Sequence, residues 1–124
     1  MKAISTTKAP AEIGPYSQAA QSGNLLFVSG QLPIDPQSGN MVEGFEAQAK
    51  MVFANLQAIL KEAGMSFANV IKASVFLKDM NDFAQLNQIY AGYFEAPFPA
   101  REAIQVARLP KDALVEISVI AVKE

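Results

Sequence analysis

Arg101 and Glu116 are the two residues of this chain whose type and place best suit chemistry. The chain has neither histidine nor cysteine among its 124 residues. This excludes the common nucleophile systems that need histidine or cysteine, and it excludes the usual zinc sites. Any catalysis must therefore use carboxylates, Arg, Lys, Tyr, Ser, backbone amides and water.

Arg101 opens an expected strand directly after a Pro97-Phe98-Pro99 loop, so its base is fixed while its guanidinium can reach a cleft. The planar guanidinium fork suits a carboxylate ligand. The alternative is an exposed arginine paired with a surface acid. Glu116 lies in mid-strand among apolar neighbours, where an unpaired carboxylate is costly to bury. It either holds or activates a water, or it forms an ion pair, with Arg101 as a candidate because we expect both on one sheet face.

Four further residues could contribute to a pocket. Tyr16 follows Gly14-Pro15, a turn that can present a phenol to a pocket or leave it half-buried at the surface. Ser29-Gly30 ends an apolar strand, where the glycine amide could donate to a ligand or simply end the strand. Asn87, on an expected helix, can be a ligand contact or a solvated helix residue. No phosphate loop, dinucleotide fingerprint or metal-ligand spacing occurs, so we expect no cofactor and no metal.

The hydrophobic periodicity indicates two helices and six strands. Apolar residues recur at steps of three and four over 45–63, followed by Gly64, and again over 83–94, with Asn81-Asp82 as the expected cap. Strands are expected at about 2–5, 17–21, 25–30, 70–77, 101–108 and 113–122, with a hairpin turn at 22–24. The order βββαβαββ predicts one α+β domain over 1–124: a two-layer fold with a mixed six-stranded sheet and both helices on one face.

The last strand shows what the second sheet face carries. One side holds Val115, Ile117, Val119 and Ala121, which suit burial under the helices. The other side mixes apolar residues with Glu116, and we expect Arg101 on the same face. Exposure of the apolar residues on this face to water is unfavourable, and association into a symmetric oligomer commonly buries such a face. We therefore predict a homo-oligomer whose interface contains this face.

The charges give no sign of a polyanionic partner. Ten basic and twelve acidic residues leave a net charge of −2, without runs of like charge. We therefore do not expect nucleic-acid or membrane binding. The first residues lack the apolar run of a signal peptide, and no apolar stretch approaches the roughly 18 residues of a membrane span. The expectation is a cytoplasmic protein.

Taken together, the segments resemble the RidA/YjgF/UK114 family of reactive-intermediate deaminases, also named for endoribonuclease L-PSP. The similarity covers essentially the whole chain, and its joint pattern is specific although no single piece is. It is carried by Ala11-Glu12-Ile13-Gly14-Pro15-Tyr16-Ser17-Gln18, Ser29-Gly30-Gln31-Leu32-Pro33, Gln48 through Gly64, Lys72-Ala73-Ser74-Val75-Phe76-Leu77, Pro99-Ala100-Arg101, and Val106-Ala107-Arg108-Leu109-Pro110-Lys111-Asp112 leading to Val115-Glu116-Ile117.

The resemblance implies a chorismate-mutase-like homotrimer with clefts between subunits. It also implies hydrolysis of 2-imino acids, such as 2-aminoacrylate (2-iminopropanoate) and 2-iminobutanoate, which pyridoxal-phosphate enzymes release, to 2-oxo acids and ammonia without a cofactor. By the same resemblance, Arg101 binds the substrate carboxylate and Glu116 positions the attacking water. Further substrate-binding residues follow at the matching positions: Tyr16, Ser29, Gly30, Asn87 and the backbone of Ala103.

The sequence departs from the common family form at Glu102, Ala103 and Ser118. Ala103 should share the Arg101 side of its strand, where only its backbone need face substrate. Glu102 should point away, yet a carboxylate beside Arg101 can compete for the guanidinium. Two alternatives to the deaminase stay open: an endoribonuclease or translation inhibitor, an activity that the family resemblance also implies, and a catalytically weak regulatory module that binds small carboxylates, which Glu102 favours.

Overall fold

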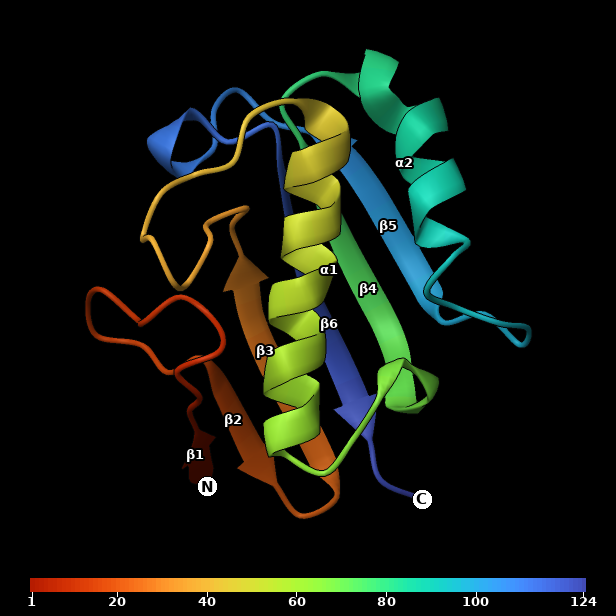
Figure 1. Cartoon of the computed structure of the whole chain (residues 1–124). Helices are drawn as coiled ribbons and strands as arrows, with labels where there is room; N and C mark the ends of the chain where they lie inside the picture. The colour runs from red at the N-terminus through yellow and green to blue at the C-terminus, as the bar shows by residue number, and fades with distance from the viewer.

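The computed structural model describes residues 1–124 and has the two-layer α+β architecture expected from the sequence (Figure 1). Six strands form one sheet in the spatial order β1-β2-β3-β6-β4-β5. Only β4 and β5 are parallel, so the sheet is mixed. The elements are β1 (Lys2–Ile4), β2 (Ala19–Ser22), β3 (Leu25–Gln31), α1 (Phe45–Glu62), β4 (Val70–Leu77), α2 (Phe83–Tyr90), β5 (Ala100–Gln105) and β6 (Val115–Val122), with short 3₁₀ turns η1 (Phe67–Asn69), η2 (Met80–Asp82) and η3 (Pro110–Asp112).

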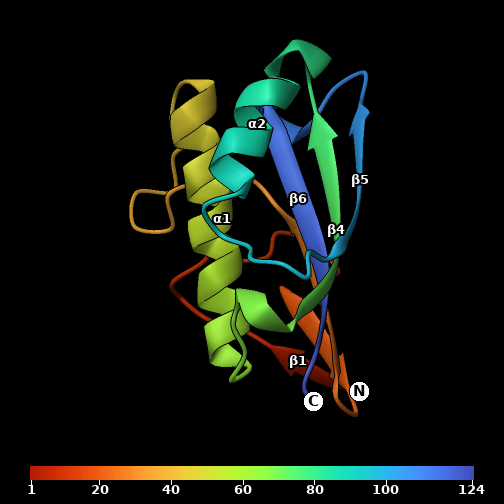
Figure 2. The same cartoon turned by 90° about the vertical axis from the view of Figure 1, so that its right-hand side faces the viewer.

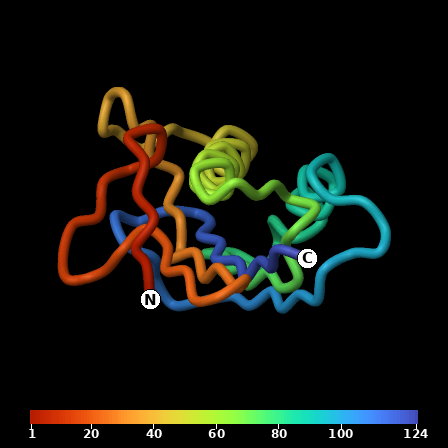
Figure 3. The backbone as a smooth tube through the Cα atoms, turned by 90° about the horizontal axis from the view of Figure 1, so that it is seen from below, coloured from red at the N-terminus to blue at the C-terminus, as the bar shows by residue number.

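Both helices pack on the same face of the sheet, as predicted, and no helix covers the opposite face (Figures 2 and 3). The core between the layers contains 25 buried apolar residues. Alternate residues of β6 face this core, namely Val115, Ile117, Val119 and Ala121. Burial of such apolar surface is the main stabilising contribution to a fold of this size. Neither helix combines the length and the apolar composition needed to cross a lipid bilayer.

Helix α1 follows the predicted periodicity closely. Its buried residues lie on one stripe that includes Val52, Phe53 and Leu56. The helix ends one residue before the expected position, with Ala63 as the C-cap and Gly64 at φ +73°. A residue with a side chain would be strained in this left-handed conformation, so glycine is the natural residue for ending the helix here.

Helix α2 begins at Phe83, as predicted, but its end and its side-chain cap differ from the prediction. It ends at Tyr90 rather than Phe94, yet Phe94 still packs in the core directly after the turn at 91–93. Burial explains the periodic pattern beyond the helix end, because a turn can bury an aromatic ring as a helix does. At the start, Asp79 and not Asn81-Asp82 provides the side-chain cap: its carboxylate accepts the backbone N–H of Asn81 at 2.9 Å in η2, directly before α2.

The strands differ from their predicted ranges mainly where turns adjoin them. β5 ends at Gln105 instead of residue 108, and β6 begins at Val115 instead of residue 113 because residue 113 and a bend at residue 114 lie between η3 and the strand. β2 begins at Ala19 rather than residue 17. β3 continues through Ser29 and Gly30 to Gln31, with a register shift in which these two residues span one position of β6. This is a β-bulge, a feature that redirects the side chains next to it.

The register of β4 places Arg101 and Glu116 on opposite faces of the sheet, so the prediction of a shared face was wrong. Arg101 pairs with Ala73, whose side chain is buried in the core beneath the helices. Glu116 pairs with Phe76, which points to the uncovered face. The error arose because β5 is an edge strand without a clear alternation of buried and exposed residues. Only its pairing with β4 fixes the direction of each side chain.

Candidate active site

A cavity of about 610 Å³ lies where the N-terminal loop, the end of β3 and η3 meet. Four residues that we singled out in the sequence line it: Tyr16, Ser29, Gly30 and Glu116. The remaining lining residues are Pro10, Ala11, Ile13, Gln18, Gln31, Leu32, Ile34, Pro110 and Lys111. The cavity is thus mainly apolar, with a few converging polar groups, as is typical of small-molecule sites.

Glu116 is the only carboxylate in this cavity, and it is half-buried. It forms no ion pair and no side-chain hydrogen bond within the chain. Burial raises the pKa of the Glu116 carboxyl above its ordinary value, because the charged form loses hydration. A half-buried carboxylate without a protein partner is able to bind a water or a polar ligand group.

The carboxylate of Glu116 lies directly over the backbone of Gly30. A Cβ atom at residue 30 would be 2.6 Å from Oε2 and 2.8 Å from Cδ of Glu116. Real Cβ atoms do not approach other atoms so closely, so only glycine permits this position of the carboxylate. The glycine therefore has a steric reason for its place in the bulge, beyond ending a strand.

Ser29 and Tyr16 are tied to one wall of the cavity. The Ser29 hydroxyl donates to the carbonyl oxygen of Ser17 at 2.6 Å, and the Ser29 amide donates to the carbonyl oxygen of Gln18 at 2.9 Å. The Tyr16 ring is half exposed, and its hydroxyl accepts the backbone N–H of Ile13 at 3.4 Å. The structure thus places the phenol at the cavity mouth, on a loop that Ser29 connects to the sheet.

Gln18 supports the same wall, a role that its place in the sequence did not indicate. Its side chain is 2% exposed, and its Oε1 accepts the backbone N–H of Thr6 at 2.8 Å. Its Nε2 lies within hydrogen-bond distance of the carbonyl oxygens of Thr6, Ala9 and Pro10, at 3.1, 3.4 and 2.8 Å. A buried amide with this many partners fixes the backbone of the loop that brings Pro10 to the cavity wall. No local pattern could indicate it, because all of these partners are backbone groups.

Arg101 belongs to a second cluster, between β5 and α2. Its Nη1 donates to Oδ1 of Asn87 at 2.8 Å. Its Cζ lies 4.8 Å from the centre of the Tyr90 ring and 5.4 Å from that of Phe83. Ala103 pairs with Val75 on this side of the sheet, so it shares the Arg101 side. Arg101 and Asn87, both selected from the sequence, are therefore in direct contact, and the arginine pairs with no acid.

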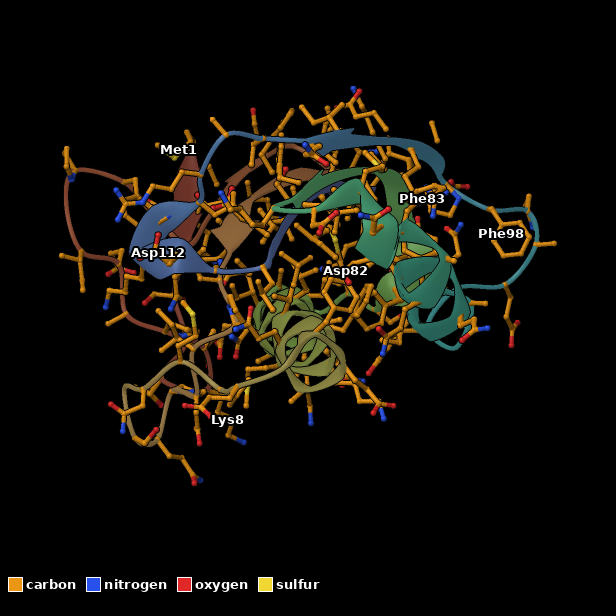
Figure 4. The ribbon with its side chains drawn as sticks, turned by 90° about the horizontal axis from the view of Figure 1, so that it is seen from above. Met1, Lys8, Asp82, Phe83, Phe98 and Asp112 are labelled. Carbon is orange, nitrogen blue, oxygen red and sulfur yellow. The ribbon has the colours of Figure 1, made fainter.

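The two clusters are separate within one chain. η3, which carries Asp112 and borders the Glu116 cavity, lies at one side of the molecule, whereas Phe83 and α2 lie at the other (Figures 1 and 4). The ion pair between Arg101 and Glu116 that we considered does not form. One isolated chain therefore cannot apply both side chains to the same small molecule.

Glu102 does not compete for the Arg101 guanidinium. It points to the opposite side of β5, where its Oε2 accepts the hydroxyl of Ser74 at 2.6 Å and its Oε1 lies 3.5 Å from Nζ of Lys72. The Ser74 hydrogen bond, followed by the Lys72 charge, lowers the pKa of the Glu102 carboxyl. Ser118 pairs with Ser74 on this same face. No three His, Cys, Asp or Glu residues gather as a possible metal site.

Because Glu116 is partly buried, we expect it to make the free energy of unfolding depend on pH. Because its pKa is raised above the ordinary 4.5 in the folded chain, folding favours the protonated carboxyl. That contribution to the free energy of unfolding is complete below the unfolded-state pKa and is lost as pH rises through the folded-state pKa. Glu116→Gln stays neutral, so we expect its stability relative to the unchanged protein to increase between pH 4 and pH 7 in urea unfolding. If the free energies of unfolding of the two proteins change in parallel with pH, the prediction of a raised pKa at Glu116 is wrong.

Comparison with known proteins assigns the family. The family model described as endoribonuclease L-PSP matches residues 6–123. The mouse 2-iminobutanoate/2-iminopropanoate deaminase is 54% identical, over 98% of this chain and 91% of the mouse protein. RidA from the Antarctic bacterium Psychrobacter sp. PAMC 21119 superposes with a TM-score of 0.97 at 47% identity, over 99% of this chain and all of that one. E. coli TdcF, solved with bound serine, has a TM-score of 0.96 at 43% identity, with both chains fully covered. On the sequence and the fold alike, the chain belongs to the RidA/YjgF family.

Proposed function

We propose that the protein is a deaminase that hydrolyses 2-imino acids to 2-oxo acids and ammonia. The observation that carries the proposal is Glu116, a half-buried carboxylate without a protein partner in a cavity of small-molecule size. Arg101 supplies the complementary group, a guanidinium that is oriented by Asn87 and engaged by no acid. The deaminase name of the 54% identical mouse relative supports the same reaction.

The active site is proposed to form between subunits of a homotrimer. Arg101 and Glu116 lie on opposite faces of the sheet in one chain, so a neighbouring chain must bring the second group to the substrate. The uncovered face also exposes Phe27 and Ile104, each to nearly half of its surface, and association would bury them. The number of three subunits follows from the family resemblance.

In the proposed mechanism, the Arg101 guanidinium binds the substrate carboxylate through paired hydrogen bonds. Glu116 orients a water toward C2 and accepts its proton as the oxygen bonds to that carbon. This proton passes to the nitrogen, which gives an amino alcohol at C2. The proton of the new hydroxyl then moves to the nitrogen as the C–N bond breaks, so ammonia leaves and the C2 oxygen becomes the carbonyl of the 2-oxo acid. Tyr16, Ser29 and the Gly30 amide hold the rest of the substrate. Imines are already electrophilic, so positioning and electrostatics suffice without a cofactor.

The proposed substrates are small imino acids such as 2-iminopropanoate and 2-iminobutanoate, with the tautomer 2-aminoacrylate. Pyridoxal-phosphate enzymes that act on serine or threonine release them, and a cytoplasmic location is proposed because it would place the protein beside such enzymes. TdcF with bound serine supports a ligand of this kind, since serine carries the same α-carboxylate and a nitrogen on C2.

The direct test is to generate 2-iminobutanoate from threonine with a dehydratase and follow the release of 2-oxobutanoate and ammonia. We expect the purified protein to accelerate release in proportion to its concentration. Arg101→Ala, measured beside it, should leave only the spontaneous rate. Equal rates with and without the unchanged protein would overturn the deaminase.

A ribonuclease is the second candidate, favoured by the description of the matching family model as an endoribonuclease. The absence of histidine and a net charge of −2 oppose it, because cleavage of RNA calls for acid–base groups and cationic phosphate contacts. RNA cleavage that persists in Arg101→Ala after repeated purification would support this candidate. The alternative of a weak carboxylate-binding module was based on competition of Glu102 for the Arg101 guanidinium. Glu102 instead contacts Ser74 and Lys72, so this support is lost.

A further inference from the structure

Tyr90 is a buried tyrosine whose hydroxyl finds no hydrogen-bond partner within the chain. Its side chain is only 6% exposed. Buried hydroxyls are normally paired, so no hydroxyl contact within this chain accounts for the position of Tyr90. The ring does have a specific partner, the Arg101 guanidinium at 4.8 Å. Its role is therefore to be sought in the aromatic ring.

The ring of Tyr90 packs against two other aromatic rings. It stacks on Phe94 with centroids 4.4 Å apart and meets Phe53 edge-on at 6.0 Å. Phe53 lies fully buried in α1. The aromatic surface under Arg101 is thus anchored in the core of the protein. A cation over such a fixed ring is attracted by the negative face of its π-system.

Three residues of α2 contact the guanidinium, and their spacing places them on one stripe of the helix. Phe83, Asn87 and Tyr90 stand at i, i+4 and i+7. Asn87 fixes one N–H in the guanidinium plane through the 2.8 Å hydrogen bond, whereas the two rings contact the charged group by its Cζ. Figure 4 shows Phe83 on α2 beside the edge of the sheet. The helix therefore restricts both the rotation and the position of the guanidinium.

These contacts leave most of the arginine's hydrogen-bonding capacity available. A guanidinium has five N–H donors, and the only side-chain acceptor here is Asn87. Aromatic rings hold the cation without consuming its donors, unlike a carboxylate partner. We propose that Tyr90, together with Phe83, is a positioning residue that orders the Arg101 guanidinium in advance for an anionic carboxylate. The proposal rests on the proposed function for the identity of that carboxylate.

The physical consequence is a lower entropy penalty on binding. An arginine side chain loses rotamer freedom when it grips a ligand, and pre-ordering removes part of that loss. The effect belongs to binding of the carboxylate and not to attack of the water. Loss of the ring should therefore weaken the binding of substrate and product analogues while the chemical step is retained.

The test compares Tyr90→Phe, Tyr90→Leu and Phe83→Leu with the control Tyr93→Leu. Tyr93 stacks on Phe53 at 4.3 Å in the same aromatic cluster and has no contact with Arg101, so its variant reports the loss of packing alone. Phe83 is only partly buried, so Phe83→Leu remains informative if Tyr90→Leu does not fold. Two measurements are made: KM and kcat for 2-iminobutanoate, and guanidinium rotation by ¹⁵N NMR.

The NMR measurement is direct because the chain has only two arginines, Arg101 and Arg108. We expect Tyr90→Leu to speed rotation of the Arg101 guanidinium and to raise KM about tenfold with kcat within about twofold. Phe83→Leu should act in the same direction. Tyr90→Phe should behave as the unchanged protein, and Tyr93→Leu should lower the Tm without either effect.

Unchanged rotation of Arg101 in both Tyr90→Leu and Phe83→Leu would overturn the proposal, as would equal increases of KM in Tyr93→Leu and Tyr90→Leu. The NMR readout separates this failure from that of the proposed function. If the unchanged protein hydrolyses no imine, guanidinium rotation still decides whether the rings order Arg101. If it is active and rotation is unaffected, only the positioning role is lost.

Discussion

Arg101→Lys is expected to lower kcat/KM for 2-iminobutanoate by about 100-fold or more. Lysine keeps the positive charge but cannot form the paired hydrogen bonds of a guanidinium with a carboxylate. Hydrogen bonds to charged groups contribute about 1.5–3 kcal/mol each, and about 1.4 kcal/mol corresponds to a factor of ten. Lysine also lacks the planar group that bonds Asn87 and lies against the rings of Phe83 and Tyr90.

Arg108→Lys is the matched control, because Arg108 is the other arginine of the chain. Its guanidinium pairs with Asp112 at 2.8 Å, and both side chains are 73% exposed. Exposed ion pairs of this kind contribute little to stability. We expect Arg108→Lys to keep kcat/KM within about twofold of the unchanged protein. Full activity of Arg101→Lys under the same conditions would refute the role of Arg101 as carboxylate anchor.

Gly30→Ala should abolish most of the activity with little loss of stability. The new Cβ would lie 2.6 Å from Oε2 of Glu116, so one of the two must move. The atoms in conflict are at the free end of a flexible side chain, and the Glu116 carboxylate can swing aside into the cavity. We expect kcat to fall about 100-fold because the water-orienting carboxylate is displaced, which is the usual scale for a misplaced catalytic group.

Gly92→Ala provides the comparison for Gly30→Ala. Apart from its chain neighbours, its Cβ would meet one atom, the carbonyl oxygen of Ile89, in a tight contact of 3.3 Å, and the residue lies outside the Glu116 cavity. Thermal unfolding and steady-state kinetics of both variants separate stability from activity. A Gly30→Ala protein with normal kcat would show that the position of Glu116 over residue 30 does not matter. A large drop in its Tm would show that the backbone, rather than the carboxylate, had to move.

The elements that could be predicted from the sequence are those with strong contrast between buried and exposed residues. α1 and β6 each carry an unbroken apolar stripe, and the structure buries those stripes as expected. β5 lacks such contrast because it is an edge strand. Its alternating side chains were therefore assigned to the wrong faces of the sheet, and Arg101 was predicted on the face of Glu116. The direction of a side chain on such a strand depends on its neighbour, which a local pattern does not contain.

The residue types of the candidate site could be predicted from the sequence, but the spatial arrangement of these residues could not. Glu116 stood out because a carboxylate among apolar residues needs a partner or a role, and Arg101 stood out through its fork of donors. The bulge at Ser29-Gly30 depends on the pairing of β3 with the distant strand β6, and the four contacts of Gln18 depend on how the loop before it folds back on the side chain. Tertiary register and buried backbone groups set these features, so periodicity could not reveal them.

The placement of Arg101 and Glu116 on opposite sides of the sheet has a consequence for a newly synthesised chain. If the site forms between neighbours, as proposed, a chain that has folded but not yet met its neighbours is dormant. After folding, it carries one half of each of two active sites: Arg101 belongs to one site and Glu116 to the other. The amount of working enzyme then follows the extent of assembly, so dilution silences the protein without unfolding it.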